Sequence, residues 1–246
     1  MFLQVGAFDQ FQQRIEQDFN GTANAPAGPP VVFDNRVDGE LEEPTSRVWN
    51  IEFDQQLGAS VLLRVNYREN RARGRLVVNH VVDNAGAALA LSSTGRLLGR
   101  EFDATLRWTL PDRGDLYVSF SKIRTTGDLN DFGVLYDNLR EPLVRENERI
   151  FQPFEVPNRL LLWGVLALPK GFTLTPGIEW RKGFPYTFYA EDYTVVGERN
   201  ATRFPRFLSV DVAVTKRLEL LGRQADLGVQ FYNLTSHDNP REPGQP

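Results

Sequence analysis

The residues of this chain that are best placed to do chemistry are nine charged side chains that alternate with apolar neighbours. They are Glu52, Asp54, Arg64, Glu101, Asp103, Arg107, Glu179, Arg181 and Asp211. Carboxylates and guanidiniums at every second position can pair with each other, or with a polar ligand, along one face of a strand. We expect them to line a polar interior wall, either as specific contacts or only as a solvated surface.

Known catalytic motifs are absent from the sequence. It has none of the G-x-S-x-G, H-E-x-x-H, P-loop or G-x-G-x-x-G patterns. Cysteine does not occur, which excludes disulfides, thiolate catalysis and cysteine metal sites. His80 and His237 are far apart in the sequence, and the stretch 128–131 lacks the ligand spacing of an EF-hand. The sequence therefore predicts no enzyme activity, no metal site and no cofactor.

Alternation with a period of two predicts the elements that position these charges. In 207–216 every second residue is aliphatic, and these residues are Leu208, Val210, Val212 and Val214. Similar alternation occurs in 49–54, 59–68, 101–108, 116–121, 172–181 and 226–231, whereas both faces of 159–168 are apolar. Because a period of two indicates a strand, the sequence predicts an all-β protein with about eight strands.

The connections between these strands alternate between short and long. Short turns are predicted around Gly58, 111–114, 169–171 and 221–223, and long connections at about 69–97, 125–156 and 183–205. This order places all short turns at one rim, as in outer-membrane β-barrels with short periplasmic turns and long extracellular loops. The strands, of about 9–12 residues, are long enough to cross a bilayer at a tilt. We therefore expect an antiparallel transmembrane β-barrel, with β-prone pieces such as 76–78 forming hairpins above the membrane.

Tryptophan placement and overall charge agree with this prediction. Trp49, Trp108 and Trp180 lie on the apolar faces toward strand ends, and they are expected to form an interfacial girdle. Together with the aliphatic residues of 207–216, they are expected to face lipid; the alternative is the core of a soluble sandwich. The formal net charge of −4 gives no basic field for nucleic acid. No signal peptide is visible after Met1.

The whole chain, 1–246, is interpreted as one partial barrel domain. Residues 1–46 are expected to be a loop-rich N-terminal segment, 47–234 a meander of membrane strands, and 235–246 a truncated loop. An open strand edge cannot stay in hydrocarbon. A chain that begins and stops in loops is therefore expected to be a fragment.

A series of short stretches follows one another in a recognisable order and spacing from residue 47 to 241. They are 47–54 (RVWNIEFD), 127–132 (GDLNDF), 157–160 (PNRL), 168–172 (LPKGF), 180–186 (WRKGFPY), 203–211 (RFPRFLSVD) and 231–235 (FYNLT). On these residues the chain resembles the C-terminal barrel portion of TonB-dependent outer-membrane receptors. It is most similar to their Oar-like subgroup, which has a carboxypeptidase-regulatory-like N-terminal domain.

The resemblance implies a barrel of about 22 strands around a globular plug, in the outer membrane of a Gram-negative bacterium. The implied partners are outer-membrane lipid, the TonB complex acting through the plug, and a small ligand that the sequence does not identify. The implied function is energy-dependent uptake of a scarce ligand, either a metal chelate or an oligosaccharide. The sequence departs from the family by lacking a plug, a TonB box and a closing strand, so roles held by those parts are not transferred.

Two other functions remain open from the sequence. The first is a small outer-membrane barrel that acts as an anchor or adhesin. The second is a soluble all-β domain that is either carbohydrate-binding or hydrolytic, which would need few exposed aliphatic side chains on its outer faces.

Overall fold

The structure is a computed structural model that describes residues 8–10, 13–20, 25–84, 86–133, 145–190 and 195–239. Strands make up most of these residues, and short 3-10 turns occur at η1 (Phe8–Gln10) and η2 (Pro169–Gly171). Within the described ranges, no helix is long and apolar enough to cross a membrane.

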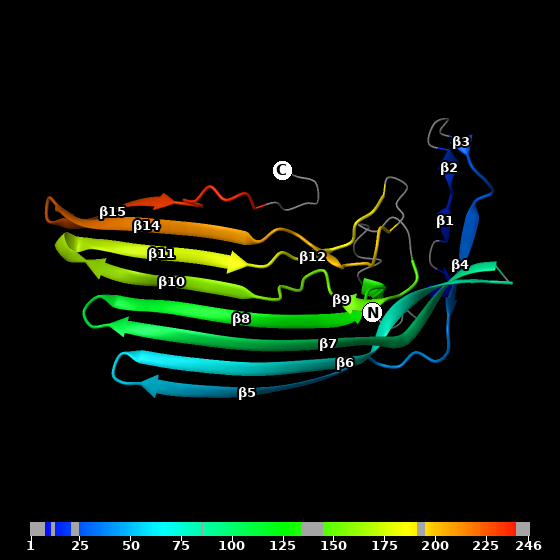
Figure 1. The fold of residues 1–246 in the computed structure, drawn as a ribbon, viewed down its shortest axis with the longest axis horizontal. Helices are drawn as coiled ribbons and strands as arrows, with labels where there is room; N and C mark the ends of the chain where they lie inside the picture. Colours follow the sequence, from blue (N-terminus) through cyan, green and yellow to red (C-terminus); the bar gives the residue numbers. More distant parts are fainter. Residues whose placement is uncertain are drawn as a thin grey trace.

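Eight strands form an antiparallel meander in chain order, which we call the wall (Figure 1). They are β5 (Thr45–Leu57), β6 (Val61–Asp83), β7 (Gly86–Leu110), β8 (Gly114–Asp128), β10 (Arg159–Leu168), β11 (Phe172–Arg181), β14 (Phe207–Leu220) and β15 (Arg223–Phe231). Each of these strands pairs antiparallel with the next one in the series. The prediction of an all-β meander is therefore confirmed.

All four short connections of the wall lie at one rim, on the left in Figure 1. The connection from β14 to β15 contains only Leu221 and Gly222, with φ angles of 51° and 72°. Positive φ at both central residues is the signature of a type I′ turn, whose twist suits a two-residue hairpin. The short turns occur where the sequence predicted them.

The strands β6 and β7 are much longer than predicted, with 23 and 25 residues. They continue past the rest of the wall as one hairpin, so most of the stretch expected to be a loop at 69–97 is strand. The register shifts between Arg73 and Val77, and Gly74 in this region has a φ angle of 66°. Such a β-bulge bends a strand and increases its twist. The hairpin therefore changes direction where it leaves the wall.

The N-terminal segment contains more structure than the loop-rich segment that was expected. β4 (Val31–Val37) pairs parallel with β7, from Phe33 opposite Ala87 to Val37 opposite Leu91. β1 (Arg14–Glu16) pairs with β4, and β2 (Phe19–Asn20) pairs separately with β3 (Ala25–Pro26). The pairing of β4 was not predicted, because β4 is only seven residues long and its partner is about 50 positions away, so periodicity alone does not reveal it.

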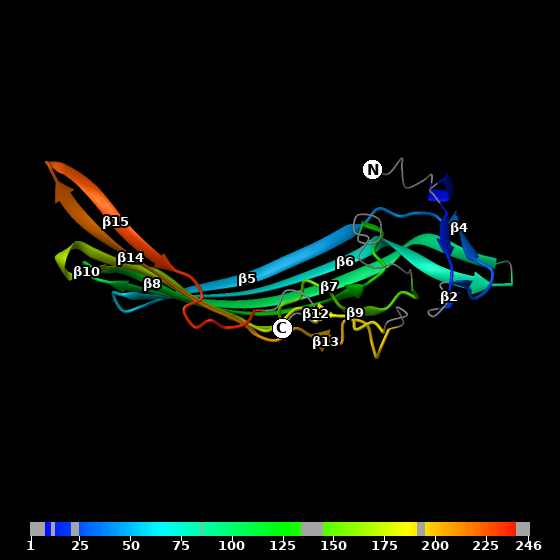
Figure 2. The ribbon, with the colours of Figure 1, turned by 90° about the horizontal axis from the view of Figure 1, so that it is seen from above.

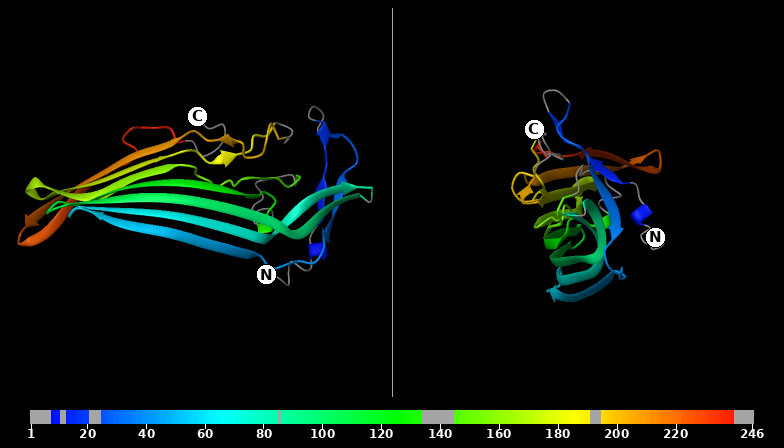
Figure 3. Two further views of the ribbon diagram at one scale, coloured as in Figure 1. Left: turned by 60° about the horizontal axis from the view of Figure 1, so that its bottom comes forward. Right: turned by 90° about the vertical axis from the view of Figure 1, so that its right-hand side faces the viewer.

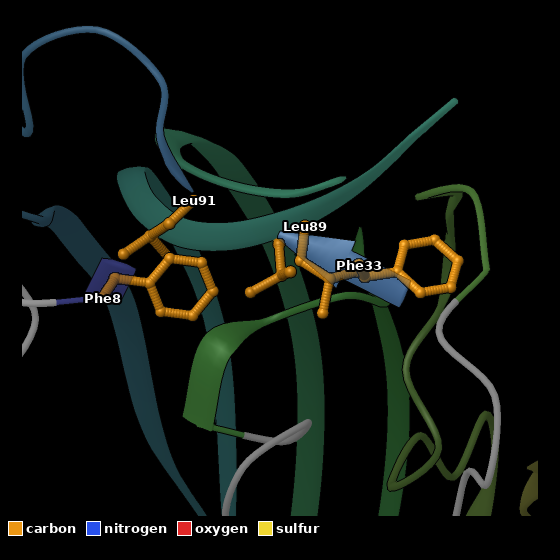
Figure 4. Close-up of a cluster of buried hydrophobic side chains, with 5 residues drawn as sticks. Phe8, Phe33, Leu89 and Leu91 are labelled. Carbon is orange, nitrogen blue, oxygen red and sulfur yellow. The ribbon is translucent and has the colours of Figure 1, made fainter. Parts of the chain in front are cut away.

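The parallel pair covers the hairpin and forms a small apolar core outside the wall (Figure 4). The buried members of this core are Phe8, Phe33, Val78, Leu89 and Leu91. The hairpin extension carries several apolar side chains, and burying them against η1 and β4 removes them from water. The core of this chain therefore lies at the end of the molecule opposite the short turns.

The wall itself is a single layer that is bowed and twisted (Figures 2 and 3). The apolar side chains of its alternating rows are exposed or half-buried; Ile51 is 64% and Phe53 56% exposed. The fully buried apolar residues among those described are Phe8, Phe33, Val77, Val78, Ala88, Leu89, Ala90, Leu91 and Leu129, and none belongs to the alternating apolar rows of the wall. No second layer of described residues therefore packs on this face.

Candidate functional site

The strand register gives the wall one apolar and one polar face. Residues directly opposite each other in an antiparallel pair point to the same face. One row runs from Val65 through Ala104, Phe120 and Leu160 to Trp180. The seven residues predicted to face lipid all belong to this apolar face: Trp49, Trp108, Trp180, Leu208, Val210, Val212 and Val214.

The nine predicted charged residues all belong to the opposite, polar face. A representative row runs from Asp54 through Arg64, Thr105 and Ser119 to Leu161, and Leu161 is opposite Glu179. The same parity applies to Glu52, Glu101, Asp103, Arg107, Arg181 and Asp211. The sequence pattern therefore sorted the charged and apolar residues onto the two faces that the structure shows.

Ion pairs between neighbouring strands cross the polar face. Arg64 of β6 binds both carboxylate oxygens of Asp54 in β5, through Nε at 2.9 Å and Nη2 at 2.8 Å. Arg107 of β7 forms the same two-pronged contact with Asp115 of β8, at 3.1 and 3.0 Å. Paired guanidinium and carboxylate groups of this geometry are among the stronger polar contacts in proteins. The charges therefore hold neighbouring strands in register on the polar face.

Two further pairs continue this pattern on the other half of the wall. Glu179 accepts a hydrogen bond from Arg159 Nε at 2.9 Å and lies 3.3 Å from Arg181 Nε. Arg217 Nε donates to Asp226 at 3.1 Å. Glu101 lies opposite Arg68, and Asp211 accepts hydrogen bonds from Ser209 and from the backbone N–H of Asn233.

Half of these partners were not among the predicted residues. Asp115, Arg159, Arg217 and Asp226 were missed because alternation assigns a residue to a face but does not identify its partner on the next strand. Counting residues outward from the short turns would have found two of them. Asp115 pairs eight residues from Arg107 across a turn, and Asp226 nine residues from Arg217.

An apolar patch interrupts the polar face near the short-turn rim. β10 places Leu161, Trp163 and Val165 on this face, and Trp163 stacks on Tyr117 of β8 with centroids 5.2 Å apart and planes 6° apart. A depression of about 690 Å³ adjoins the pair and is also lined by Asp115 and Thr175. Since Trp163 and Val165 are 40% and 54% exposed, the patch offers an apolar contact surface.

A second pocket, of about 300 Å³, lies on the polar face at the opposite end of the wall. The segment after β9 (Arg149–Phe151) extends the exposed ring of Phe154 toward it, and Arg68, Asn70, Glu101 and Thr125 supply polar groups. An aromatic face beside charged and hydroxyl groups suits a polar ligand that has ring-shaped or apolar parts. Glu101 is the residue of the predicted set that this pocket includes.

Buried polar residues link the long connections to each other. Asn130 is fully buried and donates hydrogen bonds to the carbonyl oxygens of Val78 and Arg145, at 3.0 and 2.6 Å. Its own side-chain oxygen accepts a hydrogen bond from Arg199 at 3.1 Å. The stretch 128–131, which superficially suggests a calcium loop, thus uses its amide as a structural link. Among the described residues, no group of three or more His, Cys, Asp or Glu could hold a metal ion.

The aromatic and arginine side chains of the long connections contact mostly each other. Arg145 lies over the ring of Tyr189 at 5.5 Å, and Phe151 lies between Arg124 and Arg203 at 5.6 and 5.1 Å. Phe132 contacts Phe8 in the apolar core. Arg149 forms an ion pair with Asp128. Of these loop side chains, Phe154 is the one that lines the second pocket. Tyr136, Arg140 and Tyr193 lie outside the described residues.

Comparisons with known proteins support the barrel architecture. No protein-family model matches the chain, and no curated protein matches it in sequence. The crystal structure of the outer membrane transporter YddB from Escherichia coli is similar over 83% of this chain, with a TM-score of 0.59 and 14% identity. The chain spans 30% of the length of that transporter. It therefore has the all-β, largely antiparallel fold of a segment of an outer-membrane barrel.

Proposed function

We propose that this chain forms part of the barrel wall of an outer-membrane transporter, which takes up a scarce ligand with energy from the TonB complex. The observation that carries the proposal is a single-layered sheet whose apolar face has no described residue packed on it. An exposed apolar surface of this size is unfavourable in water, at roughly 25 cal/mol per Å². In a bilayer the lipid tails cover it, while the polar face lines a wet lumen.

The proposal gives each face a role. Trp49, Trp108 and Trp180 form the interfacial girdle, and the aliphatic residues of β14 face the hydrocarbon of a bacterial outer membrane. The nine charged residues of the polar face line the lumen, where Glu52, Asp54, Arg64, Arg107 and Glu179 pair across strands. Both edges of the wall have a partner on one side only, β6 for β5 and β14 for β15, so further strands would have to close the barrel.

Dependence on TonB and membership of the Oar-like subgroup rest on the whole series of seven sequence stretches, from 47–54 to 231–235. A plug, which that resemblance implies, would lie against the polar face, and its removal would open a path for the ligand. The second pocket, beside Phe154, would contact the ligand on its way in. The role proposed is binding and passage of a metal chelate or an oligosaccharide, without catalysis.

Labelling of single cysteines tests the membrane topology. Because the chain has no cysteine, each substitution gives an unambiguous signal. Asn84→Cys at the tip of the β6–β7 hairpin should react with a membrane-impermeant maleimide on intact cells. Arg113→Cys in a short turn should react only after the outer membrane is permeabilised. Equal labelling of both positions on intact cells would contradict the orientation, and labelling of Val212→Cys by a water-soluble maleimide would favour a soluble domain.

Uptake assays test the transport role. Cells with the intact gene should accumulate one member of a panel of radiolabelled ferric chelates and maltodextrins, and deletion of the gene should abolish this accumulation. A protonophore, or deletion of the host TonB, should abolish it as well. If no member of the panel depends on the gene while adherence to surfaces does, the anchor or adhesin function replaces this one.

A further inference from the structure

A band of cations lies on the apolar face, just beyond the end of its apolar rows. Seven residues form this basic belt: Arg47, Arg71, Arg73, Arg96, Arg100, Lys122 and Arg124. In each strand, these residues occupy the positions between those of the polar face. They therefore lie on the same face as the tryptophans. All seven are exposed.

The register orders the belt in successive rows that leave the apolar face. The first row pairs Tyr67 with Phe102 and Phe102 with Lys122. In the second row Arg100 is opposite Arg124, in the third Arg47 is opposite Arg71, and in the fourth Arg73 is opposite Arg96. Rows on one face are two residues apart, or roughly 7 Å along a strand. The cations thus begin where the aromatic residues end and extend over several rows.

Aromatic residues lie where the apolar rows end and the basic belt begins. Trp49 and Tyr67 are on the same face of adjacent strands, with ring centroids 5.3 Å apart. Tryptophan and tyrosine are enriched at the level of lipid headgroups, where one end of the side chain is apolar and the other is wet. The belt therefore starts at headgroup depth if the apolar face is in a bilayer.

Two acids, Glu69 and Asp128, lie in these rows, so they offset only part of the charge of the seven cations. Glu69 and Asp128 have side chains that are each only 5% exposed. Arg71 and Arg100 both contact Glu69 through Nε, at 2.6 and 2.9 Å, and remain 58% and 48% exposed. Within the described chain, the terminal Nη nitrogens of these two arginines make no hydrogen bond. A buried carboxylate thus holds two guanidiniums whose outer donors are open to a ligand.

The other end of the same four strands has no such charge. On β5–β8 the apolar face ends near the short turns with Leu57, Val61, Trp108, Leu110 and Leu116. On these four strands, the positive charge of this face is therefore confined to the end that carries the long hairpin. A belt that served only to keep the rim wet would not need this asymmetry.

We infer that the basic belt binds a lipid whose headgroup carries several phosphate groups, in the leaflet on the long-hairpin side of the membrane. Guanidinium groups bind phosphate oxygens in a two-pronged geometry. Cations spread over several rows match phosphates at more than one depth better than they match a single phosphate. The inference rests on the proposed membrane location and names the lipid that would surround this part of the wall.

Binding of purified protein in neutral detergent to fluorescent bisphosphoryl lipid A tests the inference. The belt variant Arg47→Gln/Arg73→Gln/Arg124→Gln removes three exposed cations that make no ion pair within the described chain. The control variant Arg113→Gln/Lys170→Gln/Arg223→Gln removes three exposed cations at the short-turn rim, so its net charge changes equally. At about fivefold per cation, the belt variant should bind on the order of 100-fold more weakly, and the control should bind as wild type.

Three outcomes would overturn the inference. They are unchanged affinity of the belt variant, equal losses in both variants, and full displacement of the lipid by millimolar inorganic phosphate, which would indicate a site for free phosphate. Monophosphoryl lipid A should bind more weakly than the bisphosphoryl form, and equal binding would also count against it. Cysteine labelling at 84 and 113 in the belt variant reports separately whether the membrane topology holds, so failure of the lipid site and failure of the transporter proposal are distinguishable.

Discussion

Val212 and Ala213 are neighbours in β14 that the register places on opposite faces of the wall. Val212 is opposite Pro176 on the apolar face, and Ala213 is opposite Thr175 on the polar face. We predict that Val212→Lys lowers the free energy of unfolding by about 2–4 kcal/mol in a bilayer, because it places a charge at mid-depth in hydrocarbon. Ala213→Lys should cost much less, since its ammonium group would lie in a wet lumen.

Urea titration of the protein refolded into phosphatidylcholine vesicles measures both costs. The two substitutions add the same side chain at adjacent positions, so each is the control for the other. Equal destabilisation would remove the distinction between a lipid face and a lumen face, and with it the membrane location.

Glu69 has a pH dependence that follows from its two arginines. Glu69 accepts hydrogen bonds from Nε of Arg71 and of Arg100, at 2.6 and 2.9 Å, and both of these bonds favour its ionised form. A carboxylate whose folded-state pKa is depressed stabilises the fold above its unfolded-state pKa, and this stabilisation is lost as pH falls through the folded-state pKa. We predict that the urea midpoint of the wild type falls as the pH is lowered below 5. The midpoint of Glu69→Gln should fall less over the same change of pH.

The comparison of pH profiles isolates this one group, because all other carboxylates are shared by the two proteins. Parallel profiles from pH 7 downward would mean that the arginines do not stabilise the ionised form. In the lipid A binding assay, Glu69→Gln should bind more weakly than wild type, since Arg71 and Arg100 lose the group that positions them.

At the scale of elements, Gly74 allows β6 to change direction between the wall and the hairpin. It has a φ angle of 66°, and an added Cβ would lie 3.1 Å from the carbonyl oxygen of Glu43. Gly58 has a φ angle of 68° but nothing within 4 Å of the same position. For an L-residue the left-handed conformation costs about 1–2 kcal/mol at either site. We predict that only Gly74→Ala also loosens the hairpin, because the crowding there displaces β6 from the 43–44 segment.

Amide exchange of the hairpin measures this difference. In Gly74→Ala the amides of Val77 and Leu89 should exchange faster than in wild type, whereas in Gly58→Ala they should not. If both variants leave the hairpin protected to the same degree, the bulge does not control its direction.

The sequence predicts the elements that are determined by residues close to each other in the chain. The eight wall strands follow from alternation, and the four short turns follow from turn residues such as Gly58 and Gly222. The parallel pairing of β4 with β7 was missed, because it joins residues about 50 positions apart and depends on the apolar tip of the hairpin. The ion-pair partners Asp115 and Asp226 were missed for a related reason, since a face can be read from periodicity but a partner requires the register.

For the whole molecule, the two edges of the wall set the strongest constraint. All 13 residues of β5 and all nine residues of β15 are exposed, whereas the inner strand β11 is mostly half-buried. In hydrocarbon each unpaired backbone group costs several kcal/mol. An open edge would therefore cost tens of kcal/mol, which exceeds the net stability of about 5–15 kcal/mol that folded proteins have.

We therefore predict that both edges are paired when the protein is in its membrane. Hydrogen exchange followed by mass spectrometry should show peptides 47–57 and 223–231 as strongly protected as peptide 172–181, which is paired on both sides here. The same peptides in urea give the unprotected reference. Fast exchange at the edges beside slow exchange in β11 would mean that the wall does not lie in hydrocarbon as part of a closed barrel. A mass equal to two copies of the chain would identify a second copy, instead of further strands, as the partner of the edges.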